Sequence, residues 1–257
     1  MNAIEVKDLS FGYTRSHKVL DGLSLCSNKG SINVLLGLNG SGKTTLIKLL
    51  AGLLTPYSGQ ILLNGKNSVD LSIRERSKIM SYVAQRSSAI DDFAVKDYLL
   101  FGKVNQLNFY QSPGKTEVEN VEQYAEKFGI TQYLNKNLGE LSGGQRQIVS
   151  ICAAIIQNTE IVILDEPTSA LDIKNQHVVL ALLKEIASKE GKTFILSSHN
   201  PNHALYLDCN VFLLKDGRVL DSGSAKDIVT IDKLKPVYGD EICFSNEHDY
   251  MEISFKD

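Results

Sequence analysis

The sequence predicts an α/β fold with a mainly parallel core sheet, an N-terminal antiparallel β layer and an inserted α-helical subdomain. Three observations lead to this prediction. The first forty residues alternate apolar and polar side chains, later apolar runs alternate with helical stretches, and the middle of the chain is polar with helical spacing. With 257 residues, 43% of them hydrophobic, the chain is long enough for one domain carrying a substantial insertion.

Composition narrows the class of protein. The formal net charge of −3 provides no global positive field, so nucleic acid is not the expected partner. The four cysteines are scattered without a CxxC pair, which favours reduced thiols over disulfides or a structural metal. No signal peptide and no run of about 18 apolar residues is seen. We therefore expect a cytosolic chain whose membrane role, if any, comes through a partner.

The N-terminal alternation predicts antiparallel strands. It is clearest in Ile4-Glu5-Val6 and Phe11-Gly12-Tyr13, with turn residues at Asn28-Lys29-Gly30. The pattern then changes to a short apolar run, Ser31-Ile32-Asn33-Val34-Leu35-Leu36, as in a strand buried on both faces. A helical stretch follows from Leu46 to Gly52. The glycine-rich segment between them is thus a loop between a strand and a helix.

That loop matches the phosphate-binding pattern GxxxxGK[ST]. Its glycines allow backbone N–H groups to surround phosphate oxygens, and the following helix directs its positive end at the same anion. Lys43 is predicted to neutralise β- and γ-phosphates, and the Thr44 hydroxyl to bind Mg²⁺. The sequence therefore predicts a P-loop NTPase core. The predicted nucleotide-binding residues of the loop are Gly37, Leu38, Asn39, Gly40, Ser41, Gly42, Lys43, Thr44 and Thr45.

The rest of the chain suggests further divisions within a single domain, 1–257. Residues 87–158 are polar and helix-spaced, which predicts the helical subdomain, and residues 1–86 and 159–227 form a RecA-like core with the antiparallel layer. Residues 228–257 show no strong periodicity and are expected to be a C-terminal tail. In the second part of the core, apolar runs at 161–164, 193–196 and 211–214 predict strands, and 175–190 predicts a helix.

Two carboxylates follow the apolar run Ile161 to Leu164. Ligands of open α/β sheets collect at this kind of strand end. Asp165 is predicted to hold Mg²⁺, and Glu166, on the opposite side of an extended backbone, to accept the proton of an attacking water. Taken alone, two acids here would more often be a solvated strand exit. The phosphate loop is what makes the catalytic interpretation stronger.

A second candidate anion site is Leu141-Ser142-Gly143-Gly144-Gln145. Ser142 is predicted to cap a helix beginning near Gln145, with the N–H groups of Gly143 and Gly144 exposed at its positive end. A phosphate loop, this pentapeptide and an acidic strand end, in that order, resemble the ATP-binding cassette (ABC) family. The resemblance covers about residues 3 to 225 and implies an ATPase that uses ATP and Mg²⁺.

The resemblance implies further site residues. Tyr13 matches the aromatic on which adenine stacks, and Gln85 the glutamine that contacts Mg²⁺ and the attacking water. His199 matches the histidine that contacts the γ-phosphate, and Asp172 ends a loop that touches the opposite subunit. Alone, Tyr13 and His199 would be packing or structural residues, Gln85 a solvated side chain and Asp172 a helix N-cap. His203 matches no motif and is left out of the site.

The family also implies a mechanism and partners. Two copies pair head to tail, so that Ser142, Gly143, Gly144 and Gln145 of one face the ATP held by the other. Integral-membrane permease subunits then bind at the cytoplasmic face of the membrane, near Gln85 to Leu100, with a substrate-binding protein involved indirectly. The segment from His199 to Leu205 is similar to that in ATPases of iron–siderophore, haem, cobalamin and other metal-chelate importers.

Other readings of the sequence remain open. The chain is also compatible with an ABC ATPase of another importer or an exporter, or with a non-transport ABC ATPase acting in DNA repair or on ribosomes. A small-molecule kinase would use a phosphate loop but gives no role to the pentapeptide or to His199. The sequence does not identify the cargo.

Overall fold

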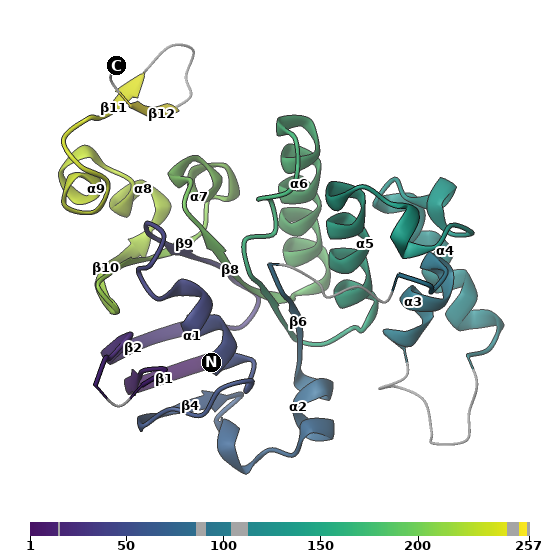
Figure 1. The fold of residues 1–257 in the computed structure, drawn as a ribbon, viewed down its shortest axis with the longest axis horizontal. Coiled ribbons are helices and arrows are strands. Elements are labelled where there is room, and N and C mark those ends of the chain that lie inside the picture. The colour runs from purple at the N-terminus through teal and green to yellow at the C-terminus, as the bar shows by residue number, and fades with distance from the viewer. Residues whose placement is uncertain (15, 86–90, 104–112, 246–251, 256–257) are drawn as a thin grey trace.

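The computed structural model describes residues 1–14, 16–85, 91–103, 113–245 and 252–255. Two sheets form its centre, and helices lie between and beside them (Figure 1). This is the predicted α/β architecture. In the described part of the chain, no helix has both the length and the apolar composition needed to cross a membrane.

The first sheet is antiparallel and contains the N-terminus. Its strand order is β2-β1-β4-β5. Burial alternates along β2, as expected for a sheet with one face on the core. Two of its strands come from beyond the first forty residues. The strands are β1 (Asn2–Phe11), β2 (Leu20–Asn28), β4 (Ser58–Leu63) and β5 (Lys66–Asn67).

The second sheet carries the site. Its order is β10-β9-β3-β8-β7-β6, and every pairing is parallel except that of the edge strand β10 with β9. The central strands β3, β7 and β8 are buried throughout, which explains their mostly apolar sequences. The strands are β3 (Ile32–Leu36), β6 (Met80–Val83), β7 (Ile161–Leu164), β8 (Thr193–Ser198), β9 (Asn210–Lys215) and β10 (Arg218–Ser224).

The register of this sheet brings distant segments together. Leu36 at the end of β3 pairs with Ser198, and Leu164 at the end of β7 pairs with Leu196. Val83 at the end of β6 pairs with Leu164. The segments that follow these strands therefore leave the same edge of the sheet, as parallel strands require.

The helices divide the core into two hydrophobic clusters. One lies between the two sheets and includes Leu46, Ile47 and Leu50 of α1. The other lies on the opposite face of the parallel sheet, where α5 and α6 pack. The α-helices are α1 (Lys43–Leu50), α2 (Ile73–Ile79), α3 (Val95–Phe101), α4 (Lys115–Lys127), α5 (Gly143–Ile156), α6 (Ile173–Glu190), α7 (Pro201–Leu207), α8 (Ala225–Ile228) and α9 (Ile231–Tyr238).

A helical group lies at one side of the molecule (Figure 1). It contains α3, α4 and α5, which fall within the segment 87–158. Leu99 of α3 and Val121 and Ala125 of α4 are buried in the same cluster as the apolar face of α5. Short 3₁₀ turns, η3 (Thr131–Tyr133) and η4 (Leu138–Glu140), connect α4 to α5.

In its described part, the C-terminal segment has regular elements that the sequence pattern did not predict. Residues 228–257 contain α9 and a two-stranded sheet of β11 (Ile242–Ser245) and β12 (Glu252–Phe255). Leu234, Val237 and Tyr238 of α9 are buried at helical spacing. The sequence did not show this helical spacing clearly, because the helix has only eight residues and contains Pro236.

Candidate active site

The phosphate loop connects β3 to α1 and leaves the start of α1 open. Gly42 precedes the helix with a left-handed φ of 101°, and no side chain caps the first turn. The N–H groups of a first helical turn have no intrahelical partners, and the helix dipole is positive there. A Cβ on Gly42 would also lie 2.7 Å from Leu20 Cδ2, so only glycine fits. The helix start is thus shaped to receive an anion.

Lys43 lies in this loop with its amine enclosed. Its Nζ donates to the carbonyl oxygens of Gly37 at 2.7 Å and Leu38 at 2.9 Å, and the residue is 5% exposed. Burial lowers the pKa of Lys43, while the nearby carboxylates of Glu166 and Asp165 oppose this effect. A cation in this position attracts phosphate strongly because little water screens it.

Asp165 is the buried acid of the site, with 1% of its surface exposed. Its Oδ1 accepts hydrogen bonds from Thr44 Oγ1 at 3.1 Å and Ser197 Oγ at 2.7 Å. Ser197 Oγ also accepts a bond from the Glu166 N–H at 2.8 Å. Burial raises the pKa of Asp165, and the two hydroxyl donors partly offset that rise. The start of α1 is thereby linked to the carboxyl ends of β7 and β8.

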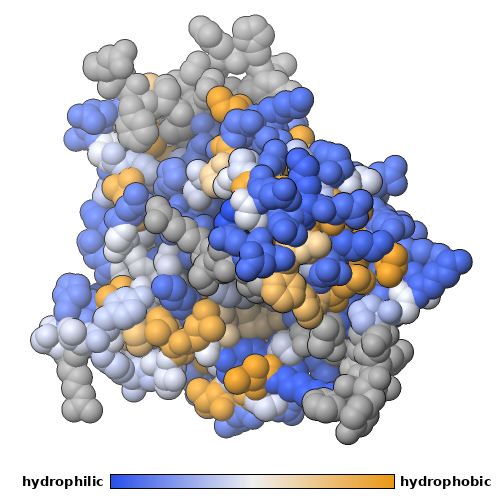
Figure 2. Space-filling model, turned by 45° about the vertical axis from the view of Figure 1, so that its right-hand side comes forward, coloured by the Kyte–Doolittle hydropathy of each residue, from blue (hydrophilic) through white to orange (hydrophobic). Residues whose placement is uncertain are grey.

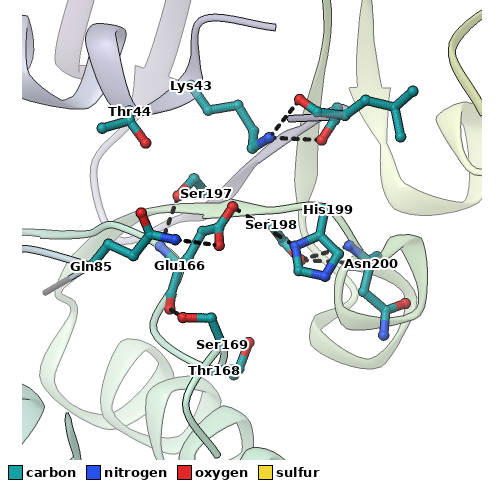
Figure 3. A network of polar contacts seen from close by, with 12 residues as sticks. Lys43, Thr44, Gln85, Glu166, Thr168, Ser169, Ser197, Ser198, His199 and Asn200 are labelled. Carbon is teal, nitrogen blue, oxygen red and sulfur yellow. Dashed lines mark hydrogen bonds and ion pairs between the residues drawn. The ribbon is translucent and has the colours of Figure 1, made fainter. Parts of the chain in front are cut away.

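Glu166 is not in the extended conformation that the sequence suggested. Its φ is 45°, in the left-handed region, because the chain turns as soon as β7 ends and Ser169 N donates to the Glu166 carbonyl oxygen at 3.2 Å. The side chain points toward Gln85 and His199 (Figure 3). Gln85 Nε2 donates to Glu166 Oε2 at 2.9 Å, and His199 Nδ1 lies 3.7 Å from Glu166 Oε1.

These residues surround a cavity of about 330 Å³. The structure thus brings together the phosphate loop, Gln85, Glu166 and His199, which are remote in the sequence. Tyr13 lies nearby, 60% exposed, with its hydroxyl oxygen 3.3 Å from Thr45 Oγ1 and its ring packed edge-on against Phe11. The lining residues are Val19, Asn39, Gly40, Gly42, Lys43, Thr44, Thr45, Gln85, Glu166 and His199.

The pentapeptide does not join this cavity. Helix α5 begins at Gly143, two residues earlier than predicted, and Ser142 and Gln145 form a reciprocal capping box. A Cβ added to Gly143 would have no atom within 4 Å. A Cβ added to Gly144 would lie 2.9 Å from the carbonyl oxygen of Ala170. Asp172 caps α6 by accepting a bond from Asn175 N. None of these residues is among those that line the described cavity.

Sequence reasoning missed two residues of the site. Ser197 joins Asp165 to Glu166 through its hydroxyl, and Val19 lines the cavity. Ser197 had a usable signal, because it directly follows the apolar run 193–196 and lies two residues before His199. Val19 had no such signal in the sequence, because a single apolar residue beside a strand is common.

The residues present fit a magnesium nucleotide. Ser41 Oγ is buried in the phosphate loop without a hydrogen-bond partner, and a Cβ on Gly40 would meet nothing within 4 Å. The Thr44 hydroxyl, the Asp165 carboxylate and the Gln85 amide supply oxygen donors of the kind Mg²⁺ prefers. The fold and the site together define a P-loop ATPase.

Comparison with known proteins makes the class more specific. The ABC transporter family model matches residues 20–169. The chain is 34% identical to the probable iron chelatin transport ATP-binding protein of Helicobacter pylori, over 91% of this chain and 92% of that protein. It is 31% identical to the iron(3+)-hydroxamate import ATP-binding protein FhuC of Bacillus subtilis, over 93% and 88% of the two chains.

Structure comparison agrees with this. A chain from a proposed metal-chelate type ABC transporter in an inward-facing conformation superposes with a TM-score of 0.82. It is 28% identical, and the match covers 99% of this chain and 96% of that one. The protein belongs to the ABC transporter family and is an ATPase subunit.

Proposed function

We propose that this chain is the ATP-hydrolysing subunit of an ABC importer for an iron–siderophore complex, haem, cobalamin or another metal chelate. The ATPase assignment rests on the cavity that Lys43, Glu166 and His199 line together at one edge of the parallel sheet. Relatives named for iron chelatin and iron(3+)-hydroxamate transport support the cargo class. An ABC ATPase serving another importer or an exporter has the same site and remains the alternative.

In the proposed reaction, Lys43 and the α1 N-terminus bind the phosphates and Tyr13 stacks on the adenine. Glu166 accepts the proton of the attacking water, while Gln85 and His199 hold the Glu166 carboxylate and the γ-phosphate in place. Mg²⁺ would be held by Thr44, Asp165 and Gln85, and when bound it would neutralise phosphate charge.

We further propose that the site is completed by a second copy of the chain. The N-terminus of α5 lies outside the cavity, and space is open at Gly143, so an anion can approach it from outside the chain. Head-to-tail pairing would place Ser142, Gly143, Gly144 and Gln145 on the partner's ATP, with Asp172 at the same interface. Two ATP molecules would then lie between the subunits.

A permease is proposed to dock on the surface beside α3. Phe93 and Phe101 stack edge-on with ring centroids 5.4 Å apart, yet are 38% and 54% exposed. Figure 2 shows hydrophobic patches next to hydrophilic surface on the face that includes the helical group. Exposed apolar residues of this kind favour a protein partner over nucleic acid. The ATPase would then be peripheral at the cytoplasmic face of the membrane, with a substrate-binding protein involved indirectly.

Two charged residues of the expected groove, Asp91 and Lys96, have partners within the chain. Asp91 lies 3.1 Å from Arg146, and Lys96 lies 3.1 Å from Glu122. The aromatic pair is therefore the stronger feature of this surface. Residues 86–90 of the expected groove, Gln85 to Leu100, lie outside the described part of the structure.

The decisive experiment on the ATPase mechanism is Glu166→Gln. We expect turnover to fall by about 10²- to 10⁴-fold, since a general base contributes that much, while ATP binding is retained. An ATP-dependent dimer should accumulate in size-exclusion chromatography. Glu185→Gln, the same change at an exposed α6 carboxylate that pairs with Lys189, is the control and should leave turnover unchanged. Normal phosphate release by Glu166→Gln would contradict the assigned base.

The transport assignment needs a separate test. Affinity purification from membranes should recover a polytopic membrane protein, and vesicles containing the complex should show ATP-dependent uptake of a metal chelate. Stimulation of hydrolysis by DNA or ribosomes would instead favour a non-transport ATPase. Phosphate transfer to an acceptor other than water would favour a kinase.

A further inference from the structure

The last helix, α9, is packed into the core. Leu234 is fully buried and Val237 is 8% exposed. Both belong to the same hydrophobic cluster as Ala204 and Leu207 of α7, the helix that follows His199. In Figure 1, α8 and α9 lie at the edge of the fold formed by β10 and β9.

Polar contacts also fix α9 to the β9–β10 hairpin. Lys215 Nζ donates to the Pro236 carbonyl oxygen at 2.6 Å. Lys233 Nζ lies 2.7 Å from Asp221 Oδ2. The two contacts come from different strands, so they restrict both sliding and rotation of the helix. The end of α9 consequently has a defined position relative to the core sheet.

At that end, Tyr238 reaches the active site. Its hydroxyl donates to the carbonyl oxygen of His199 at 3.0 Å. The residue is 9% exposed, and burial raises the pKa of its hydroxyl, which therefore stays protonated and able to donate. The bond joins residues 39 positions apart in the sequence. It is a contact to backbone, so it acts on where His199 is placed rather than on its chemistry.

The turn begins at Ser198, the last residue of β8, which pairs with Leu36 of β3, and the side-chain bonds within the turn are local. Ser198 Oγ accepts from Asn200 N at 3.0 Å and lies 3.0 Å from His203 Nδ1, and His203 N donates to the Asn200 carbonyl at 3.2 Å. Bonds within five residues define the shape of the turn but hold it only weakly against movement as a unit. The His199 side chain is itself 56% exposed and contacts Glu166 at 3.7 Å. Beyond the strand pairing at Ser198, Tyr238 supplies a restraint from outside the turn at His199 itself.

We propose that Tyr238 is a positioning residue for His199, and that α9 thereby forms part of the catalytic apparatus. The inference rests on the proposed function, in which His199 contacts the γ-phosphate. The buried Tyr238 hydroxyl holds the turn from Ser198 to Asn200 at the distance from Glu166 that hydrolysis requires. A small displacement of such a group reduces catalysis more than it reduces binding.

The test is Tyr238→Phe, which keeps the packed ring and removes the donor. We expect kcat for ATP hydrolysis to fall about 3- to 10-fold, with KM for ATP changed less than about twofold, as for loss of one neutral hydrogen bond. Amide hydrogen exchange at residues 197–202 should rise. Tyr206→Phe is the matched control: its hydroxyl, on α7, faces exposed His177 at 3.5 Å. It should change none of these quantities.

A double variant separates positioning from general destabilisation. In a His199→Ala background, Tyr238→Phe should reduce kcat no further, because both changes act through one side chain. An additional 3- to 10-fold loss there, or unchanged exchange and kcat in the single variant, would overturn the inference. If His199→Ala itself hydrolyses ATP normally, the proposed role of His199 fails. Increased exchange at 197–202 in Tyr238→Phe would then still support the restraint, and unchanged exchange would overturn it.

Discussion

The two anion sites of this chain differ in what holds them. The phosphate-loop half, Gly37–Thr45 with Asp165 and Glu166, is joined by Thr44, Ser197 and the Glu166 N–H, which link the start of α1 to the ends of β7 and β8. The signature half, Leu141–Gln145, is held by its own capping box and by the bond from Gln145 Nε2 to Tyr133. One half is held by hydrogen bonds between distant segments of the chain, and the other by local contacts around a helix N-terminus.

This difference has a physical meaning. A buried, interlinked site keeps its geometry without a ligand, because moving any one group breaks several hydrogen bonds. A capped helix end on the surface stays in place through local contacts but has no opposing wall. Such a site can bind and release a partner without disturbing the core. Changes in the two halves should therefore affect different properties.

The largest expected effect separates dimer formation from folding. Gly143→Val adds a side chain where a Cβ meets nothing within 4 Å, so the unfolding free energy should change by no more than about 0.5 kcal/mol. Hydrolysis should nevertheless fall about 100-fold, because the side chain blocks the partner's ATP. Phosphate release, size-exclusion chromatography with ATP and thermal unfolding measure these effects.

Gly144→Ala is the informative counterpart. Its Cβ would lie 2.9 Å from the Ala170 carbonyl oxygen, so this variant should lower the melting temperature of the monomer. If Gly143→Val destabilised the monomer as much as Gly144→Ala, the signature half would not be an open surface.

Acid sensitivity should come from His203 on α7, which belongs to neither half. Burial, with a smaller contribution from His199, lowers the pKa of His203 from its ordinary value of 6.5 to about 4. The folded state thus favours neutral histidine, and its stabilisation is full above pH 6.5. As pH falls toward 4 this stabilisation is lost, and the unfolding free energy decreases by up to about 3 kcal/mol. Urea unfolding between pH 7 and pH 4 measures it.

The control for this titration is His177, which is exposed. His203→Gln should flatten the pH dependence of stability, while His177→Gln should leave it unchanged. If the unfolding free energy fell equally steeply with pH in wild type and in His203→Gln, the acid sensitivity would have another origin.

Ser197→Ala should destabilise the chain by about 1–3 kcal/mol. The change leaves the buried Glu166 N–H without its acceptor and removes one donor from Asp165. Equilibrium urea unfolding at neutral pH gives the value. A cost below about 0.5 kcal/mol would mean that the phosphate-loop half is not held by this hydrogen-bond network.

The smallest effect is expected at the signature half. Ser142→Ala removes an exposed N-cap and should cost about 1 kcal/mol. Ser142→Asp keeps a capping acceptor and should restore most of that stability. Comparison of the three proteins by urea unfolding checks this prediction. A cost for Ser142→Ala larger than that for Ser197→Ala would reverse the ranking of the two halves.

Much of the site could be predicted because its motifs are local. The phosphate loop, the Ser142 cap and the Asp172 cap depend on residues within a few positions of one another, and those spacings are set by helix and turn geometry. The buried strand 161–164 was predicted with its observed bounds because a short, wholly apolar run has few other uses.

Only the tertiary structure decided which distant groups meet. The strand order places β8 between β3 and β7, and this order puts Ser197 of β8 beside the end of β7, where it bridges Asp165 and Glu166. The left-handed turn at Glu166 and the bond from Tyr238 to His199 follow from the same packing. Sequence fixes local backbone preferences, since these need only neighbouring residues. Contacts across the sheet depend on the register and burial of the whole core, which no short segment contains.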